Sequence, residues 1–192
     1  PEVDTGILNA AIALLTEGGF EKLTMEAVAC RAGVAKASIY RRFPSKVDLI
    51  VAMCHAFTPE TAPDIDTGSI RSDLVALVTA LAETMSDSSD TGRLMPSMLG
   101  AAKENPEVRE ALAEFSASRR TRTANIVQRG IERGELSSKA HADVIGDLIV
   151  GAVIYRTMIR NDRVDRSFTE TIVDGILDGF GTDDGRSGTP AR

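Results

Sequence analysis

The chain has 192 residues, of which 43% are hydrophobic and 26% charged, and its formal net charge is -6. This composition is that of an ordinary soluble protein, and no apolar run approaches the roughly 20 residues that a membrane span requires. Cys30 and Cys54 fall in helical patterns and are expected to fill the core of a cytoplasmic protein, and two distant histidines, His55 and His141, offer little to a metal centre. The sequence therefore predicts no membrane segment, metal or cofactor.

Basic side chains are concentrated near the start of the chain. Residues 1–57 contain six basic and six acidic residues, so the net charge of -6 belongs to residues 58–192. Between residues 31 and 46 there are five basic residues and no acidic one, namely Arg31, Lys36, Arg41, Arg42 and Lys46. A short positive segment in an acidic protein indicates a local site for an anionic partner.

The beginning of the chain is predicted to be helical. Apolar residues at helical spacing predict a helix over residues 4–17, which Gly18 and Gly19 end. Thr24 is the expected N-cap of a second helix, and Gly33 ends that helix.

A third, short helix follows immediately, from about residue 36 to 42. Its N-cap position is taken by Ala35, where a capping side chain would contribute about 1 kcal/mol. Pro44 closes this helix, because the residue before a proline avoids the helical region. Ser45 then forms a capping box with Asp48 and starts a fourth helix.

Two short helices joined by a tight glycine-containing turn are typical of a helix-turn-helix, whose second helix enters the major groove of DNA. Ile39 must face the core, so Ala37 and Arg41 point the opposite way, where a small side chain admits the backbone to the bases and an arginine can bind guanine or phosphate. Free amides at the two helix starts favour phosphate. The residues expected on these grounds to contact DNA are Thr24, Ala37, Ser38, Tyr40, Arg41, Arg42, Ser45 and Lys46. The alternative is a solvated basic face on a generic helical bundle.

Residues 58–68 are predicted to form a linker, followed by helices over residues 69–86, 91–103 and 106–133. These three helices are candidates to enclose a largely apolar small molecule, because methionine adapts to irregular shapes. The predicted pocket residues are Leu81, Met85, Met95, Met98, Leu99, Phe115 and Ile126. A Met stripe at helical spacing is also typical of plain core packing, which is the alternative interpretation.

The last two predicted helices are candidates for a subunit interface. One covers residues 138–160 and is apolar on nearly all sides, so it needs partners on every side. The other begins at a capping box of Ser167 and Glu170 and ends near Phe180. We expect a four-helix interface with a second subunit, formed by Ile145, Leu148, Ile149, Ala152, Val153, Ile172, Val173, Ile176 and Leu177. The alternative is that both helices are buried in a monomer.

Residues 7–53 resemble the N-terminal domain of the TetR family of bacterial transcriptional regulators. The shared features are Ala10-Ala11, Gly19-Phe20, Thr24, the A-x-x-A-G-V pattern at residues 29–34, Lys36, and the Y-R-x-F-x-S-K pattern at residues 40–46. The resemblance implies DNA contacts from Thr24, Lys36, Ala37, Ser38, Tyr40, Arg41 and Lys46. It also implies a homodimeric repressor that binds a palindromic operator and is released by a small molecule. The sequence departs from the family at Ala35, where Ser or Thr is common, and residues 1–3, just before the predicted first helix, include no basic residue of the arm that often lies there.

The sequence thus predicts an all-α protein of about nine helices. Residues 1–48 form a three-helix DNA-binding domain with the helix-turn-helix, residues 49–181 a larger effector-binding and dimerisation domain, and residues 182–192 a disordered tail. No nucleophile elbow, HExxH motif or phosphate-binding glycine loop is present. A small helical enzyme and a helical scaffold or interaction protein, neither binding DNA, are the alternative functions.

Overall fold

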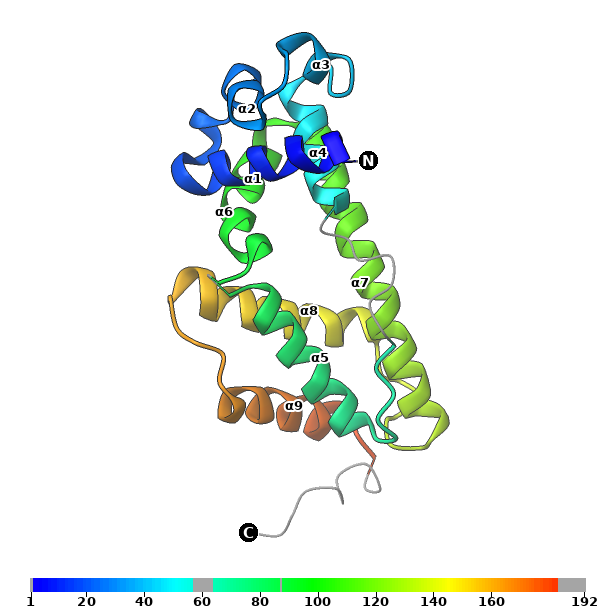
Figure 1. Ribbon diagram of the computed structural model, residues 1–192. Helices are drawn as coiled ribbons and strands as arrows, with labels where there is room; N and C mark the ends of the chain where they lie inside the picture. Colours follow the sequence, from blue (N-terminus) through cyan, green and yellow to red (C-terminus); the bar gives the residue numbers. More distant parts are fainter. Residues whose placement is uncertain (1, 57–63, 87, 183–192) are drawn as a thin grey trace. The chain divides into compact units, whose positions relative to one another are not determined.

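The computed structural model describes residues 2–56, 64–86 and 88–182 (Figure 1). In this part of the chain the regular structure is helical throughout, which confirms the all-α prediction. The helices are α1 (Glu2–Lys22), α2 (Met25–Ala32), α3 (Lys36–Tyr40), α4 (Lys46–Ala56), α5 (Ile70–Thr84), α6 (Asp90–Glu104), α7 (Pro106–Glu132), α8 (Ala142–Ile154), a π-helical turn η1 (Tyr155–Ile159) and α9 (Arg166–Phe180). The first part of the predicted linker, and the predicted tail from residue 183 on, lie outside the described residues.

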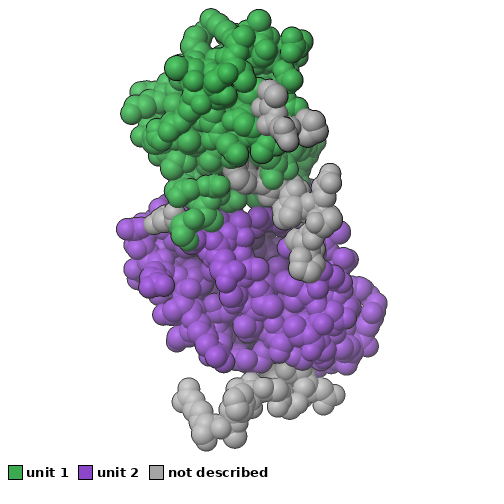
Figure 2. All heavy atoms as spheres, in the orientation of Figure 1, with its two compact units in different colours: residues 1–60, 87–116 green, residues 61–86, 117–192 purple. Residues whose placement is uncertain are grey.

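The chain forms two compact units, which are coloured separately in Figure 2. Unit 1 comprises residues 1–60 and 87–116, and unit 2 comprises residues 61–86 and 117–192. The boundary predicted after residue 48 does not coincide with this division. The reason is that α4, α6 and the first turns of α7 share an apolar core with α1, α2 and α3 in unit 1.

Unit 1 is organised around that core. α1 packs against α2, α4 and α6, and α2 packs against α3. Fully buried side chains come from all of these helices and from the turn between α1 and α2: Ile7, Leu23, Val28, Ile39, Leu49, Met53, Leu94 and Val108. α3 has only one such anchor, Ile39, and this residue fixes how the short helix is rotated against the rest of the unit.

The turns of unit 1 form where the sequence predicts them. The helical backbone of α1 is broken at Gly18 and Gly19, and Gly19 has a φ of 67°, a conformation that favours glycine. Thr24 caps α2 by accepting a hydrogen bond from the backbone N–H of Ala27 at 3.1 Å. At the other end Gly33 adopts the left-handed conformation that closes α2 (φ 67°). These local signals set the length of the first two helices.

In unit 2, α5 packs against α8 and α9. A buried carboxylate on α5 also connects this helix to the segment just before it and to the end of α7. Asp73 on α5 is fully buried. It accepts hydrogen bonds from the backbone N–H and the hydroxyl of Thr67 at 2.6 and 2.7 Å, and from the guanidinium of Arg133 at 3.0 Å. Arg133 also pairs with Asp66 and Glu135. The described end of the predicted linker is therefore attached to α5 and to the end of α7.

Two expectations about the last helices are wrong. α8 begins at Ala142 rather than near residue 138. The N-cap of α9 is Asp165, whose carboxylate accepts a hydrogen bond from the N–H of Phe168 at 2.8 Å; Ser167 lies inside the helix, and Glu170 pairs with Arg166. A carboxylate at a helix N-terminus is favoured by its charge as well as by its hydrogen bond, so the cap of α9 lies two residues before the predicted one.

Candidate nucleic-acid interface and ligand cavity

α3 turns one face to the core of unit 1 and the opposite face to solvent. Ile39 has no exposed surface, whereas Ala37 and Arg41 are exposed, Ser38 is half-buried, and Tyr40 is 40% exposed. Because successive helical residues are about 100° apart, a buried Ile39 directs the residues two before and two after it away from the core. A solvent-facing surface with small side chains and an arginine suits a helix that enters a major groove.

The starts of α2 and α4 are both capped. Beyond the Thr24 cap of α2, Ser45 and Asp48 form a reciprocal pair at the start of α4. The hydroxyl of Ser45 accepts from the N–H of Asp48 at 3.2 Å, and the carboxylate of Asp48 accepts from the N–H of Ser45 at 2.8 Å and from its hydroxyl at 2.7 Å. Neither cap uses all the N–H groups of its first turn, so each helix start retains groups that favour a phosphate.

Two cations of the predicted interface are paired with acidic residues from other helices. Lys36 forms an ion pair with Glu26, and its ammonium lies 5.6 Å from the centre of the Tyr40 ring. Nε of Arg42 lies 2.5 Å from Oδ1 of Asp4. The hydrogen bond between Lys36 and Glu26 lowers the pKa of Glu26 and raises the pKa of Lys36. The positive segment of the sequence is therefore partly neutralised in three dimensions.

The other three basic residues of the segment differ from one another. Arg31 binds Glu17 through two hydrogen bonds of 2.5 and 2.6 Å and so joins α2 to α1. Lys46 is half-buried; burial lowers the pKa of its ammonium, and the nearby carboxylate of Glu21 opposes this effect. Arg41 makes no ion pair with any residue that the structure describes. Its outward position and the absence of a described ion pair distinguish Arg41 from the other cations of the segment.

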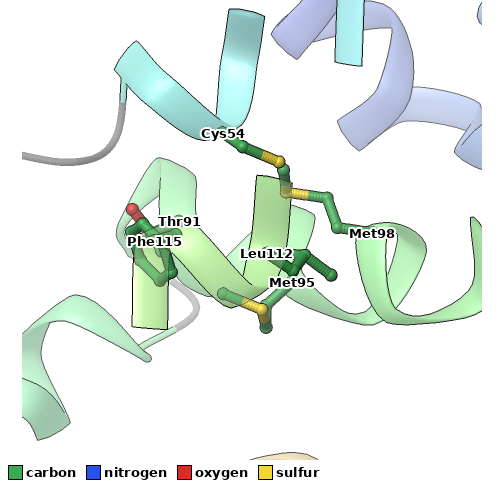
Figure 3. A pocket seen from close by; sticks show the side chains of 6 residues that line it. All are labelled: Cys54, Thr91, Met95, Met98, Leu112 and Phe115. Carbon is green, nitrogen blue, oxygen red and sulfur yellow. The ribbon is translucent and has the colours of Figure 1, made fainter. Parts of the chain in front are cut away.

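Unit 1 also contains a small apolar cavity between α4, α6 and α7. Its lining residues are Cys54, Thr91, Met95, Met98, Leu112 and Phe115 (Figure 3). The space between the side chains is too narrow to hold a water molecule, so a bound molecule would have to move them apart. Figure 3 shows the side chains of Cys54 and Met98 directed toward each other. Burial raises the pKa of the Cys54 thiol to about 11, so the lining carries no charge near neutral pH.

The predicted pocket residues do not all meet at this cavity. Met95, Met98 and Phe115 line it. Leu99 lies on the same helix but is 44% exposed, and Leu81, Met85 and Ile126 are buried residues of unit 2 that do not line it. The lining also includes Thr91 and Leu112, which the predicted pocket set omits although each lies one helical turn from a predicted residue. It includes Cys54 as well, which the sequence predicts only to fill the core. Cys30, also expected in the core, is exposed.

The residues predicted to form the dimer interface fall into two groups. Six are buried in unit 2, namely Ile145, Ile149, Val153, Val173, Ile176 and Leu177. Leu148 is 49% exposed, and Ala152 and Ile172 are half-buried. α8 and η1 also expose Val144, Val150, Tyr155 and Ile159, which the predicted set omits. The positions 144, 148, 155 and 159 recur at helical spacing, so the outer stripe could have been separated from the inner one by its phase.

The described residues contain no group of three or more His, Cys, Asp or Glu side chains arranged to hold a metal ion. None of the helices in that part of the chain is long and apolar enough to cross a membrane.

Both the beginning and the remainder of the chain match models of known protein families. Residues 7–53 match the family model described as bacterial regulatory proteins, tetR family, and residues 64–176 match the model of the Tetracyclin repressor-like, C-terminal domain. The chain is 31% identical to an uncharacterized HTH-type transcriptional regulator of Mycobacterium tuberculosis, over 91% of this chain and 85% of that protein. It is 54% identical to the HTH-type transcriptional repressor KstR of Rhodococcus jostii over 46 residues, which are 24% of this chain and 22% of the repressor.

Among solved structures, the fold is similar to that of the TetR family transcription regulator SCO0332. The TM-score is 0.68 and the sequence identity 32%, over 93% of this chain and 98% of that one.

Proposed function

Because the chain belongs to the TetR family of bacterial regulatory proteins, we propose that it is a repressor that binds operator DNA as a homodimer and releases it when an apolar small molecule enters the cavity of unit 1. As a member of this family, the chain is a ligand-responsive, DNA-binding transcriptional regulator, and its relatives are named as regulators rather than enzymes. The observation that carries the proposal is the rotation of α3, which buries Ile39 and exposes Ala37 and Arg41.

A dimer would supply contacts that one α3 lacks. A five-residue helix reaches few bases, whereas two copies related by a two-fold axis read an inverted repeat whose halves are about 34–36 Å apart. The exposed apolar stripe of α8 and η1, including Leu148 and Tyr155, supports association through this surface. The buried residues of the predicted interface then support α8 from within the subunit.

The cavity is a suitable place for an effector to act on DNA binding. Cys54 lines it from the last turn of α4, and the same helix begins at Lys46, one of the predicted phosphate contacts. A molecule that spreads Met95 and Met98 away from Cys54 would move α4 together with its DNA-facing start. The effector would release DNA by stabilising the conformation with the displaced α4. The uncharged lining favours an apolar effector without a formal charge.

The DNA part of the proposal is tested by selecting sequences from a random duplex library with the purified protein. Bound sequences should contain an inverted repeat. Arg41→Ala should then weaken binding to the selected duplex by about 1–3 kcal/mol per lost base contact and affect random duplex less. Lys46→Ala should weaken both duplexes alike and reduce the salt slope by about 1. Equal losses on both duplexes for both variants would contradict these roles, and failure to enrich any sequence would contradict the proposed function.

The effector part is tested by screening neutral apolar compounds against matched compounds that carry a carboxylate. Release of the selected duplex should be confined to the neutral set, because a charge in this cavity would lack a partner. Release by the charged set alone would exclude this cavity as the effector site.

A further inference from the structure

The cations on α3 and just after it differ in what they contact. With the core direction set by Ile39, steps of about 100° place Ala37 and Arg41 about 160° away from the core, and Lys36 and Arg42 about 60° to either side of it. Lys36 and Arg42 therefore lie at the two edges of the helix, within reach of neighbouring helices. Both edge cations are bound to a carboxylate, whereas Arg41 on the outer face is not paired within the described residues.

The two carboxylates come from different helices of unit 1. Glu26, in the first turn of α2, binds Lys36, and Asp4, near the start of α1, binds Arg42 at 2.5 Å. Arg42 also donates a hydrogen bond to the carbonyl of Ser38 at 3.2 Å, so its guanidinium is turned back onto its own helix. Two of the cations expected at the DNA are thus already paired when no DNA is bound.

The cations of both pairs are partly exposed, so a phosphate can reach them. The side chains of Lys36 and Glu26 are 56% and 57% exposed, and those of Arg42 and Asp4 are 31% and 50% exposed. A cation that stays with its carboxylate neutralises no phosphate and so releases no counterion from the DNA, and one that leaves it for a phosphate leaves an uncompensated negative charge beside the duplex. Both effects reduce the gain from each phosphate contact.

We propose that Asp4 and Glu26 compete with DNA phosphates for Arg42 and Lys36, and thereby lower both the sequence-independent affinity for duplex DNA and its salt dependence. The inference rests on the proposed function, because it takes DNA as the ligand of α3, and it gives a role to two acidic residues outside the recognition helix. In a positioning role, by contrast, the carboxylates would hold the cations in the orientation that phosphates need, and their removal would weaken binding.

The size of the effect follows from counterion release. The logarithm of the binding constant falls with the logarithm of salt concentration by about 0.9 for each phosphate neutralised. Freeing one cation adds one such contact, so Asp4→Asn and Glu26→Gln should each steepen the slope by about 0.9 and together by about 1.8. As salt falls tenfold, from about 1 M to about 0.1 M, a slope difference of 0.9 raises the affinity of each single variant about eightfold more than that of the wild type.

The experiment measures fluorescence anisotropy of a labelled random-sequence duplex with the full-length protein across that salt range. Glu17→Gln is the matched control: it also removes one negative charge from unit 1 and also frees an arginine, but its partner Arg31 is not a predicted DNA contact. This control should keep the wild-type slope. Adding Arg42→Gln to Asp4→Asn should abolish the gain, an outcome that a general folding defect would not produce.

Steeper slopes in Asp4→Asn and Glu26→Gln, with the wild-type slope in Glu17→Gln, support the competition. Unchanged slopes, weaker binding, or an equal change in the control overturn it while leaving DNA binding by the wild type intact. A wild-type protein that binds no duplex at any salt concentration overturns the proposed function itself. The two failures are therefore distinguishable.

Discussion

Replacing Ala35 with serine tests whether a missing N-cap limits the stability of α3. Ala35 is the N-cap of α3, with an extended backbone (φ -66°, ψ 140°) and no side-chain hydrogen bond to the helix. α3 has only five residues and no acidic residue in its first turn, so no other side chain of the helix offsets the missing cap. A serine hydroxyl at an N-cap accepts a first-turn N–H and contributes about 1 kcal/mol. Since 1 kcal/mol shifts Tm by about 2–4 °C in a chain of this size, Ala35→Ser should raise Tm by that amount.

Thermal and urea unfolding followed by circular dichroism measure the change. Thr24→Ala is the reverse substitution at the start of α2, where the hydroxyl accepts from Ala27 at 3.1 Å, and it should lower the free energy of unfolding by about 1 kcal/mol. Slower hydrogen exchange at the amides of Ala37 and Ser38 would locate the gain of Ala35→Ser in α3. A Tm that stays constant or falls, in a protein where Thr24→Ala behaves as expected, would refute the cap at residue 35.

Three further predictions concern the rest of the molecule. Asp73→Asn breaks a buried ion pair and should lower the free energy of unfolding by about 2–3 kcal/mol. This is less than the usual loss of about 3–5 kcal/mol, because Arg133 keeps its other partners. Asp66→Asn, at an exposed pair, should lower it by less than about 1 kcal/mol. Burial alone would raise the pKa of Asp73, but hydrogen bonds from Thr67 and Arg133 outweigh it and lower the pKa. The stabilisation is therefore present above the unfolded pKa of about 3.9. Urea titrations at pH values below it should show the free energies of unfolding of wild type and Asp73→Asn becoming equal. A difference that grows in acid would contradict this sign. Leu148→Glu should shift the protein toward monomer in sedimentation without lowering Tm by more than a few degrees, because the side chain is half exposed; an unchanged dimer would exclude that surface. At pH 8 a thiol reagent should modify exposed Cys30 quickly and buried Cys54 only on unfolding, and two fast equivalents would show that the cavity opens to solvent.

Short-range chemistry made the first half of unit 1 predictable. Thr24, Gly33 and the Ser45–Asp48 box act on backbone groups within four residues, so their effect can be inferred from the residues themselves. Ile39 could be assigned to the core because it is the only large aliphatic residue of the short helix α3. The same reasoning placed Ala37 and Arg41 on the outer face.

Contacts between helices could not be inferred in this way. Asp4 and Arg42 are 38 positions apart, and nothing in their local sequence indicates that α1 brings them together. The two faces of α8 posed a related difficulty, because an all-round apolar helix does not reveal which stripe meets its own subunit. At α9, Asp165 and Ser167 are both capable caps, and the choice depends on charge and on the alternative partner that Arg166 gives to Glu170. Tertiary packing decides which residues of different helices form pairs, and helical spacing alone does not predict that packing.

The ion pairs of unit 1 change how the positive segment of the sequence is interpreted. Residues 1–57 are neutral overall, and the net charge of -6 in the rest of the chain opposes the approach of DNA at long range. At about 0.1 M salt this repulsion is screened beyond roughly 10 Å, so it slows encounter more than it weakens a formed complex. In the proposed complex, the contacts that remain close to the duplex are those of the outer face of α3 and of the two helix starts. Affinity in the proposed complex then depends on how accurately Ile39 holds α3 in rotation. An error of one residue would turn Arg41 by about 100° and put in its place either Arg42, which is already paired, or Tyr40, which carries no positive charge.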